Sequence, residues 1–435
     1  MRVFSKPLIL LAALLILAAS LPLQAQPFIP IITPTAPSSY GAPPAITPLP
    51  APLTDPTGWS CDDFPCADDL DGWKRRIQAA PGFAVNLYGR FPGQPMQITF
   101  GPDGRLYATV LENGTRQGAV YALDAQGNAE RVSPTFESPV GLAFAPGTDT
   151  LYVSSRTTPN ESGSLWRVLP DGTATQLIAD LPCCRNSVDS QPQGVTFGPD
   201  GYLYIGIASL SDHAEPDNPQ FERYATPQPF ESSILRVQPA NGSAEVYAAG
   251  FRDPYDLAFA PDGKLYATDN GLLDGIGDRV LMVEQGAHYG FPFWRARGCD
   301  VCPPTDFSLG IRPDLLPLPP YTLPRGITVY TGAQFPENYF GSVFVALWNG
   351  VEGAQRVIRL DPARIPTDLE ALAAFTPEPF VTGLIRPVDV TIGPDGTLLV
   401  ADFIYGFVWR VTWTGEIPPT PTPAPVIFAT NTPHP

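Results

Sequence analysis

Apolar and polar residues alternate along most of the chain, and one version of this pattern recurs five times. Each copy has a short alternating run, a turn rich in Pro, Asp and Gly, and a second run of β-branched and aromatic residues. The copies begin at Ile98, Leu142, Val195, Leu257 and Val390. Gly adopts the positive φ that such a turn requires, while Pro and Asp favour the positions before it. The pattern therefore predicts five β-hairpins.

The intervals between the copies indicate a sixth hairpin. The gap between the fourth and fifth copies is about twice as long as the others, and the segment from Gly326 within it has the same strand–turn–strand shape with a longer turn. Short β-rich runs between the hairpins complete four-stranded units. Because repeats of this length in an all-β chain favour a β-propeller, we predict an all-β, six-bladed β-propeller. We expect the segment from Gly82 to pair with the segment from Val408, which would close the ring without an open sheet edge.

The two ends of the chain differ in composition from the repeats. Residues 1–26 have a basic start, an apolar run of about a dozen residues and small residues near the end, which predicts a cleavable signal peptide. Retention as a membrane anchor is the alternative, although a spanning helix needs about 20 residues. Residues 27–57 and 416–435 are rich in Pro, Ala and Thr, which predicts a disordered linker and a disordered tail around a propeller at 58–415. We expect a secreted, periplasmic or cell-surface protein with no integral membrane domain.

The charge of the chain limits its partners. Its 435 residues include 43 acidic and 26 basic ones, a net charge of −17 at pH 7, and the predicted propeller has no basic cluster. Nucleic acid rewards a concentrated positive face, so we exclude it as a partner. The excess of carboxylates is compatible with Ca²⁺, and equally with simple solubility. We expect a monomer that acts on a small molecule.

Six cysteines lie in three close pairs, which in an exported protein predicts disulfides. The pairs are Cys61 with Cys66, Cys183 with Cys184, and Cys299 with Cys302. No His follows Cys302, as c-type haem attachment would require, and no second pair has the spacing of a zinc site. The adjacent Cys183 and Cys184 could bond to each other or to separate partners.

The loops that depart most from the repeat are candidates for a ligand site, because propellers bind ligands where loops of several blades meet on the axis. They are residues 182–193 and 250–290. Arg252 and Asp253 stand directly before a proline at a strand start. A glycine-rich turn then gathers four oxygen-bearing side chains, Asp269, Asn270, Asp274 and Asp278. This turn is a candidate cation site, and the alternative is a turn rich in Asp, Asn and Gly for conformational reasons alone.

The second of these loops resembles the soluble quinoprotein sugar dehydrogenases, which include the glucose and sorbosone dehydrogenase-like proteins. The shared phrase is matched by Gly250, Arg252, Pro254, Leu257, Ala258, Phe259, Pro261, Gly263, Leu265, Gly271, Tyr289, Gly290 and Pro292. Further matches begin at Ser233, Tyr330 and Arg386. The resemblance covers about residues 81–413 and includes this loop, which generic propeller repeats lack.

The resemblance implies an enzyme that oxidises a sugar or another alcohol with pyrroloquinoline quinone (PQQ) and Ca²⁺ on the propeller axis. Carried over by position, Arg252 would contact PQQ, and Asp253 would replace the Asn usual in the family. The backbone carbonyls of Gly271 and Leu272 would approach Ca²⁺. Arg386 would be a second cation beside the cofactor.

Two positions depart from the family pattern. The family's general base is a His preceded by Asp, whereas this chain has Asp189 followed by Ser190. A serine hydroxyl does not accept a proton at neutral pH as an imidazole does. A Lys expected to contact the cofactor is replaced by Trp348. His213 lies in a loop after the third hairpin and is a candidate replacement for the base, the alternative being an exposed loop histidine.

Three functions compete at this point. The first is a PQQ- and Ca²⁺-dependent sugar or alcohol dehydrogenase with an altered or lost base. The second is a non-catalytic extracellular propeller that binds a glycan, peptide or protein, which the missing His favours. The third is a Ca²⁺-dependent lactonase, although the sequence shows no clear set of inner-strand carboxylates for its metal.

Overall fold

The computed structural model describes residues 61, 64–112, 115–124, 126–159, 162–184, 191–213 and 228–415. All of them belong to the second of the two units, Met1–Tyr40 and Gly41–Pro435, into which the chain divides. The predicted signal peptide, Pro-rich linker and C-terminal tail lie outside the described residues. Among the described residues, no helix is long and apolar enough to cross a membrane.

The described strands form five sheets of 5, 9, 4, 4 and 4 strands. Because the nine-stranded sheet contains two hairpin-based groups of four strands, we describe them as six antiparallel units, blades 1 to 6. Blade 1 contains β3 (Gln94–Phe100), β4 (Leu106–Leu111), β5 (Gln117–Leu123) and β6 (Ala129–Arg131). Blade 2 contains β8 (Leu142–Phe144), β9 (Leu151–Arg156), β10 (Gly163–Val168) and β11 (Ala174–Leu181). Blade 3 contains β12 (Pro192–Phe197), β13 (Leu203–Ile207), β14 (Ser233–Val237) and β15 (Ala244–Ala249).

The second half of the chain supplies the other three blades. Blade 4 contains β16 (Pro254–Phe259), β17 (Leu265–Asp269), β18 (Arg279–Val283) and β19 (Leu316–Pro317). Blade 5 contains β20 (Pro324–Val329), β21 (Val343–Leu347), β22 (Arg356–Leu360) and β23 (Glu378–Thr382). Blade 6 contains β24 (Pro387–Ile392), β25 (Leu398–Asp402), β26 (Phe407–Trp413) and the N-terminal β2 (Phe83–Arg90).

The remaining elements connect or cover the blades. Two short strands are β1 (Gln78–Ala79), which extends blade 5 beyond β23, and β7 (Phe136–Glu137), which pairs with both β5 and β9. The described helices are α1 (Leu70–Arg76), α2 (Leu369–Ala373), η2 (Trp294–Arg297), η3 (Phe307–Leu309), η4 (Glu337–Tyr339) and η5 (Pro362–Arg364).

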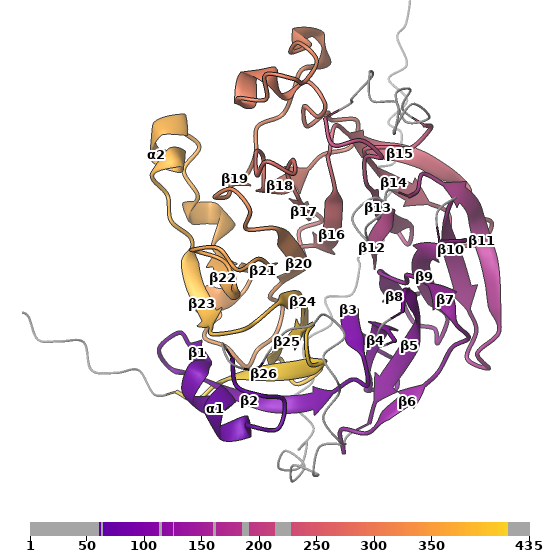
Figure 1. Cartoon of the computed structure of the whole chain (residues 1–435), viewed down its shortest axis with the longest axis vertical. Coiled ribbons are helices and arrows are strands. Elements are labelled where there is room, and N and C mark those ends of the chain that lie inside the picture. Colours follow the sequence, from indigo (N-terminus) through magenta and orange to yellow (C-terminus); the bar gives the residue numbers. More distant parts are fainter. Residues whose placement is uncertain are drawn as a thin grey trace, which may run out of the picture. The chain divides into compact units, whose positions relative to one another are not determined.

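The first strand of each blade contacts the first strand of the next. The contacts run from β3 through β8, β12, β16, β20 and β24 and return to β3. Figure 1 shows the blades following one another around a common centre. The structure therefore has the predicted all-β class and a propeller-like arrangement. The hairpin predicted from Gly326, which lacks the repeat phrase, is present as β20 and β21.

The ring is closed by strands from both ends of the described chain. β2 pairs with β26 in antiparallel register from Phe83 opposite Trp413 to Arg90 opposite Phe407, which confirms the predicted pairing, and β2 forms the edge of its sheet. The preceding helix α1 adds Trp73, whose fully buried ring lies 5.8 Å from Phe407 and 5.9 Å from Trp409. The N-terminal segment thus packs on blades 5 and 6 before it enters the ring.

The hairpin turns form as their sequence predicts. Gly104, Gly201, Gly263 and Gly396 all have φ between 77° and 84°, which side chains on L-residues disfavour. The Asp before each of them accepts the backbone N–H of the residue after the Gly, as Asp103 does from Arg105 at 3.0 Å. The same motif repeats in blades 1, 3, 4 and 6 and sets the length of each first strand.

The six first strands share a proline near their start, and the second residue after it faces the axis. In three blades this axial residue is polar and in three it is glycine. In chain order the six axial residues are Gln97, Gly141, Gly194, Asp256, Gly326 and Asp389. We call the three polar side chains, Gln97, Asp256 and Asp389, the axial lock.

Gln97 lies in blade 1, and its side chain makes hydrogen bonds to blades 2, 3 and 4. Its amide oxygen accepts the backbone N–H of Leu142 in β8 at 2.8 Å and of Val195 in β12 at 3.2 Å. Its amide nitrogen donates to Oδ1 of Asp256 in β16 at 2.7 Å. One side chain therefore bonds to the first strands of blades 2, 3 and 4.

The two aspartates complete the circuit. Oδ2 of Asp256 accepts the N–H of Ile327 in β20 at 2.9 Å, and Oδ2 of Asp389 accepts the N–H of Ile98 in β3 at 2.6 Å. Glycine is required beside them, since a Cβ on Gly194 would lie 2.5 Å from Oδ1 of Asp256, and one on Gly326 would lie 2.1 Å from Oδ1 of Asp389. The axial lock thus connects all six first strands through hydrogen bonds.

The two carboxyl groups of the axial lock have raised pKa values, because they are buried and lie close together. Burial raises the pKa of Asp256 to about 7, against the opposing effect of its backbone hydrogen bonds. Burial, reinforced by the charge of Asp256, raises the pKa of Asp389 well above its ordinary value. A carboxyl whose pKa is raised in the folded state stabilises the fold most below its unfolded pKa, near pH 4. That stability is lost as the pH rises toward 7.

We therefore predict that the free energy of unfolding falls between pH 5 and pH 8, and that Asp389→Asn reduces this fall. The amide oxygen of Asn can still accept the N–H of Ile98 and brings no charge next to Asp256. One pKa unit corresponds to about 1.4 kcal/mol, so the difference between the two proteins should amount to a few kcal/mol. Urea unfolding at both pH values measures it, with Asp274→Asn on an exposed turn as the control. Equal falls in both proteins would contradict the proposed protonation.

Candidate functional site

The predicted site residues lie at the N-terminal ends of the first strands. Because the axial lock holds equivalent residues of all six first strands in one layer, the residues that precede this layer share one face, which we call the N-terminal face. Arg252 and Asp253 precede β16, and Arg386 precedes β24. Trp348 follows β21 and also belongs to this face, since its carbonyl accepts a hydrogen bond from the Arg386 guanidinium at 3.1 Å.

Asp253 joins blades 3 and 4 from a fully buried position. Its Oδ1 accepts the side-chain amide of Gln193 in β12 at 2.8 Å, and its Oδ2 accepts the side-chain amide of Asn270 at 2.8 Å. The backbone N–H of Asn270 also donates to the Asp253 carbonyl at 3.0 Å. An Asp here receives two amide donors, which suits a carboxylate better than the Asn usual in the resembled family.

Asp269 fixes the backbone that presents Arg252. Its Oδ1 accepts the N–H groups of Arg252 at 3.1 Å and of Asp253 at 2.7 Å. Its Oδ2 accepts two bonds from the fully buried Arg279, at 2.8 and 2.7 Å. Burial raises the pKa of Asp269, and the charge of Arg279 opposes this. Arg279 also binds Asp314 at 3.1 Å, so this ion pair anchors the long insert between β18 and β19.

Asp212 is a central residue that the sequence did not reveal. Its Oδ1 accepts the Arg252 guanidinium at 3.1 Å and the backbone N–H of Leu273 at 2.9 Å. Its Oδ2 lies 3.6 Å from Nδ1 of His213. Asp212 therefore brings together a predicted cofactor residue, the turn predicted to hold Ca²⁺ and the histidine that was a candidate base. Its signal in the sequence was only its place beside His213.

Gly271 and Leu272, the predicted Ca²⁺ ligands, lie in a tight turn. The N–H of Gly271 donates to Oδ1 of Asp278 at 2.8 Å, and the carbonyl of Leu272 accepts the N–H of Gly275 at 2.8 Å. Trp294 of the insert packs on this turn, since a Cβ on Gly277 would lie 2.5 Å from its ring. Ca²⁺ binding by the two carbonyls stays a prediction.

The four oxygen-bearing residues of this loop do not form a cluster of metal-binding carboxylates. Asp269 binds Arg279, Asn270 binds Asp253, Asp278 accepts the N–H of Leu323 at 2.9 Å, and Asp274 accepts the N–H of Ile276 at 3.1 Å. In the part of the chain that the structure describes, no three His, Cys, Asp or Glu side chains are placed to hold a metal. The conformational interpretation of this Asp-rich turn fits the geometry.

Two arginines flank Trp348. The guanidinium carbon of Arg325 lies 5.3 Å from the Trp348 ring centroid, and that of Arg386 lies 5.8 Å from it. Burial lowers the pKa of Arg386; the charge of Asp402 opposes this, and the smaller effect of the Arg325 charge adds to it. Arg325 was missed in the sequence because it stands inside a strand that appeared to be core. An anion with several carboxylates would relieve the repulsion between these two cations.

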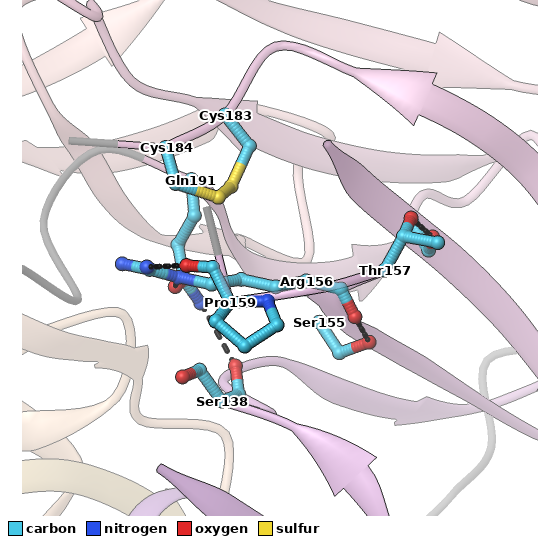
Figure 2. Close-up of a disulfide and its surroundings, with 9 residues drawn as sticks. Ser138, Ser155, Arg156, Thr157, Pro159, Cys183, Cys184 and Gln191 are labelled. Carbon is cyan, nitrogen blue, oxygen red and sulfur yellow. Dashed lines mark hydrogen bonds between the residues drawn. A yellow bond between two sulfur atoms is a disulfide. The ribbon is translucent and has the colours of Figure 1, made fainter. Parts of the chain in front are cut away.

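Asp189 and Ser190, the predicted catalytic positions, lie outside the described residues. Gln191, which follows them, is buried and firmly held. Figure 2 shows its side chain accepting a bond from Arg156 and donating to the Ser138 carbonyl, the latter at 2.9 Å. The structure thus fixes the residue at which the chain enters β12.

The cysteines form the predicted disulfides. Cys61 pairs with Cys66 and Cys299 with Cys302, and the adjacent Cys183 and Cys184 bond to each other. The last pair is buried and lies beside Arg156 and Gln191, as Figure 2 shows. Among the two sequence alternatives for this pair, the structure therefore has the vicinal bond.

Two cavities lie away from the N-terminal face. One of about 390 Å³ follows the axis from the axial lock toward the hairpin turns and is lined by all six first strands. The other, of about 770 Å³, lies between blades 4 and 5 and is lined by residues such as Tyr266, Met282 and Phe340. Neither cavity is lined by Arg252, Arg386 or Trp348.

We predict that Asp269→Ala destabilises the fold by about 3–5 kcal/mol, because it leaves the buried guanidinium of Arg279 without its main partner. Asp262→Ala is the matched control, since its ion pair with Lys264 is exposed and should contribute little. Urea unfolding of both variants measures the difference. Equal stability of the two variants would show that Arg279 does not depend on Asp269.

Comparison with known proteins agrees with this geometry. A model of the glucose / sorbosone dehydrogenase family matches residues 175–402. The fold is similar to the PQQ-bound aldose sugar dehydrogenase of Streptomyces coelicolor, at 18% identity over 77% of this chain and 99% of that chain, with a TM-score of 0.54. It is also similar to the apo form of the soluble aldose sugar dehydrogenase of Escherichia coli, at 16% identity over 76% and 99%, with a TM-score of 0.58. A calcium structure of a Trichoderma reesei carbohydrate-active enzyme of family AA12 matches at 14% identity over 78% and 97%, with a TM-score of 0.56. At these identities the likeness to the solved structures concerns the fold.

Proposed function

Because the chain belongs to the glucose/sorbosone dehydrogenase family, we propose that it is an oxidoreductase that oxidises a sugar or another alcohol with PQQ as the electron acceptor. The observation that carries this proposal is the pair of arginines, Arg325 and Arg386, that flank Trp348 at the N-terminal face, to which Arg252 also belongs. PQQ carries three carboxylates on a planar aromatic system. Buried guanidinium groups beside an aromatic ring match that chemistry.

The residues present fit the cofactor in further respects. Nε of Arg252 is buried and has no hydrogen-bond partner within the described structure, so a donor is left for an anionic ligand. Trp348 offers an aromatic surface where the family has a Lys. The carbonyls of Gly271 and Leu272 would supply oxygen ligands to Ca²⁺. When bound, PQQ accepts two electrons from the substrate, and Ca²⁺ polarises the quinone.

We also propose that the protein works outside the cytoplasm. The proposal rests on the signal-like sequence of residues 1–26 and on the Pro-rich segments 27–57 and 416–435. It is supported by three disulfides, which persist in oxidising compartments. The substrate would then be an extracellular or periplasmic sugar or alcohol.

A second candidate function is a non-catalytic propeller that binds a carbohydrate or protein. Ser190 in place of the family's His favours it, because a protein that has lost its base could keep the scaffold. The two candidates differ in whether PQQ binds and whether bound PQQ is reduced.

We predict that the purified full chain binds PQQ in the presence of Ca²⁺ and then reduces a dye with one or more members of a panel of sugars and alcohols. Quinone absorbance and quenching of tryptophan fluorescence measure binding. Arg252→Gln and Arg386→Gln should each weaken PQQ binding by about tenfold or more, since each removes a charge-assisted hydrogen-bond donor. Lys264→Gln, which changes an exposed cation on the opposite side of blade 4, is the control. Failure of the wild-type protein to bind PQQ would overturn the dehydrogenase, and binding without turnover would favour the non-catalytic propeller.

A further inference from the structure

We propose that His213, which lies beside Asp212, is the catalytic base of this site and takes the role that Ser190 cannot perform. This inference rests on the proposed function, because it concerns the proton that an alcohol loses when it is oxidised. It names a residue outside the family's own base position. The following observations on contacts, topology and burial lead to it.

Asp212 connects His213 directly to the proposed cofactor residues. Each of its two carboxylate oxygens contacts one of these residues. Oδ1 accepts a hydrogen bond from the Arg252 guanidinium at 3.1 Å, and Oδ2 lies 3.6 Å from Nδ1 of His213. Oδ1 also accepts the N–H of Leu273, at 2.9 Å, in the turn proposed to hold Ca²⁺. The Asp212 carboxylate therefore connects the His213 imidazole both to Arg252, the proposed PQQ contact, and to Leu273 in the turn proposed to hold Ca²⁺.

The topology of blade 3 explains how a base can occupy this place. In the resembled family the His precedes the first strand of the third hairpin. β12 and β13 are antiparallel, and Pro192 at the start of β12 pairs with Ile207 at the end of β13. The chain before β12 and the chain after β13 therefore leave the blade at the same end. A histidine that follows β13 is thus on the N-terminal face, like one that precedes β12.

The side chains become more exposed from Arg252 through Asp212 to His213. The side chain of Arg252 is 7% exposed, that of Asp212 is 11% exposed, and that of His213 is 27% exposed. A substrate that approaches from solvent would meet the imidazole before the carboxylate and the guanidinium. The backbone is held as well, because the N–H of Ser209 donates to the Arg252 carbonyl at 2.8 Å.

The pair has the chemistry that the step requires. A neutral imidazole accepts a proton near neutral pH, and a neighbouring carboxylate orients it and stabilises the imidazolium that forms. The O–H bond of the alcohol breaks and its proton passes to His213. Bound PQQ would supply the acceptor for the hydride, and thus for two electrons, released when the C–H bond of the hydroxyl-bearing carbon breaks. The alcohol would thereby become a carbonyl compound, and the proton held by His213 would pass to the reduced cofactor or to water.

The other histidines are less suited to this role. The chain has three histidines in all. Nδ1 of His288 accepts the N–H of Gly290 at 3.0 Å, and burial, together with the charge of Arg279, lowers the pKa of His288. His434 belongs to the C-terminal segment outside the described residues. Among the described histidines, His213 is the one that contacts the proposed site.

Kinetics of the reconstituted full chain test the proposal. We expect His213→Ala to lower kcat by about 10²- to 10⁴-fold, the usual contribution of a general base, while the Kd for PQQ changes by less than about threefold. Added imidazole should restore part of the activity of this variant and leave the wild type unchanged. His434→Ala, which removes a histidine from the C-terminal segment, is the matched control. Asp212→Asn keeps an acceptor for Leu273 and Arg252 and should lower kcat less than His213→Ala does.

A second readout does not depend on turnover. Diethyl pyrocarbonate modifies accessible histidines, and peptide mass spectrometry assigns each modification to one of the three. We expect PQQ with Ca²⁺ to slow the modification of His213 and not that of His434. Modification of His213 at the same rate with and without bound PQQ would overturn its place in the site.

The outcomes separate this inference from the function on which it rests. A wild-type protein that does not bind PQQ would overturn both. A protein that binds PQQ and turns over equally well as His213→Ala would overturn the role of His213 alone. Binding of PQQ without turnover in the wild type would also overturn it, because a competent base would then be absent.

Discussion

The rest of the structure depends on the hydrogen bonds that three axial side chains make across six blades. Each blade contributes its own hydrophobic core, but neighbouring blades are brought into register where Gln97, Asp256 and Asp389 accept backbone N–H groups from first strands other than their own. These N–H groups face the axis and have no partner in their own blade, so leaving them unpaired would cost free energy. The layer they define sets the N-terminal face. Arg325 stands one residue before this layer, and Arg386 three residues before it.

The N-terminal face combines rigid support with concentrated charge. Asp269, itself bound by Arg279, accepts the backbone N–H of Arg252. Asp253 accepts a hydrogen bond from Gln193 and so connects blade 4 to blade 3. The charge of Arg325 lowers the pKa of the neighbouring Arg386, although Asp402 opposes this, and two adjacent guanidinium groups suit a site that binds an anion.

The repeat made the architecture predictable, because alternation of apolar and polar residues and a Pro-Asp-Gly turn are local properties of the sequence. The closing pair of β2 and β26 followed from the requirement that no sheet edge stay open. The axial lock was not predictable in this way, because Gln97, Gly141 and Asp256 look unrelated until the strands are aligned in space. Asp212 was missed for the same reason, since its partner Arg252 lies 40 residues further along the chain. For the Asp-rich turn the sequence left two interpretations open, because composition does not distinguish a carboxylate that binds a metal from one that accepts backbone N–H groups, as Asp278 does.

The pairing of β2 with β26 has a consequence for the order in which the chain acquires its structure. Ala84 and Thr412 lie side by side in the sheet although 328 positions separate them in the chain. During synthesis β2 emerges first and stays without its partner until nearly the whole propeller has followed. Contacts between such distant segments form late and slowly, because the loop they close is long. A chain shortened before Phe407 would therefore leave β2 without its partner and β25 unpaired on one side.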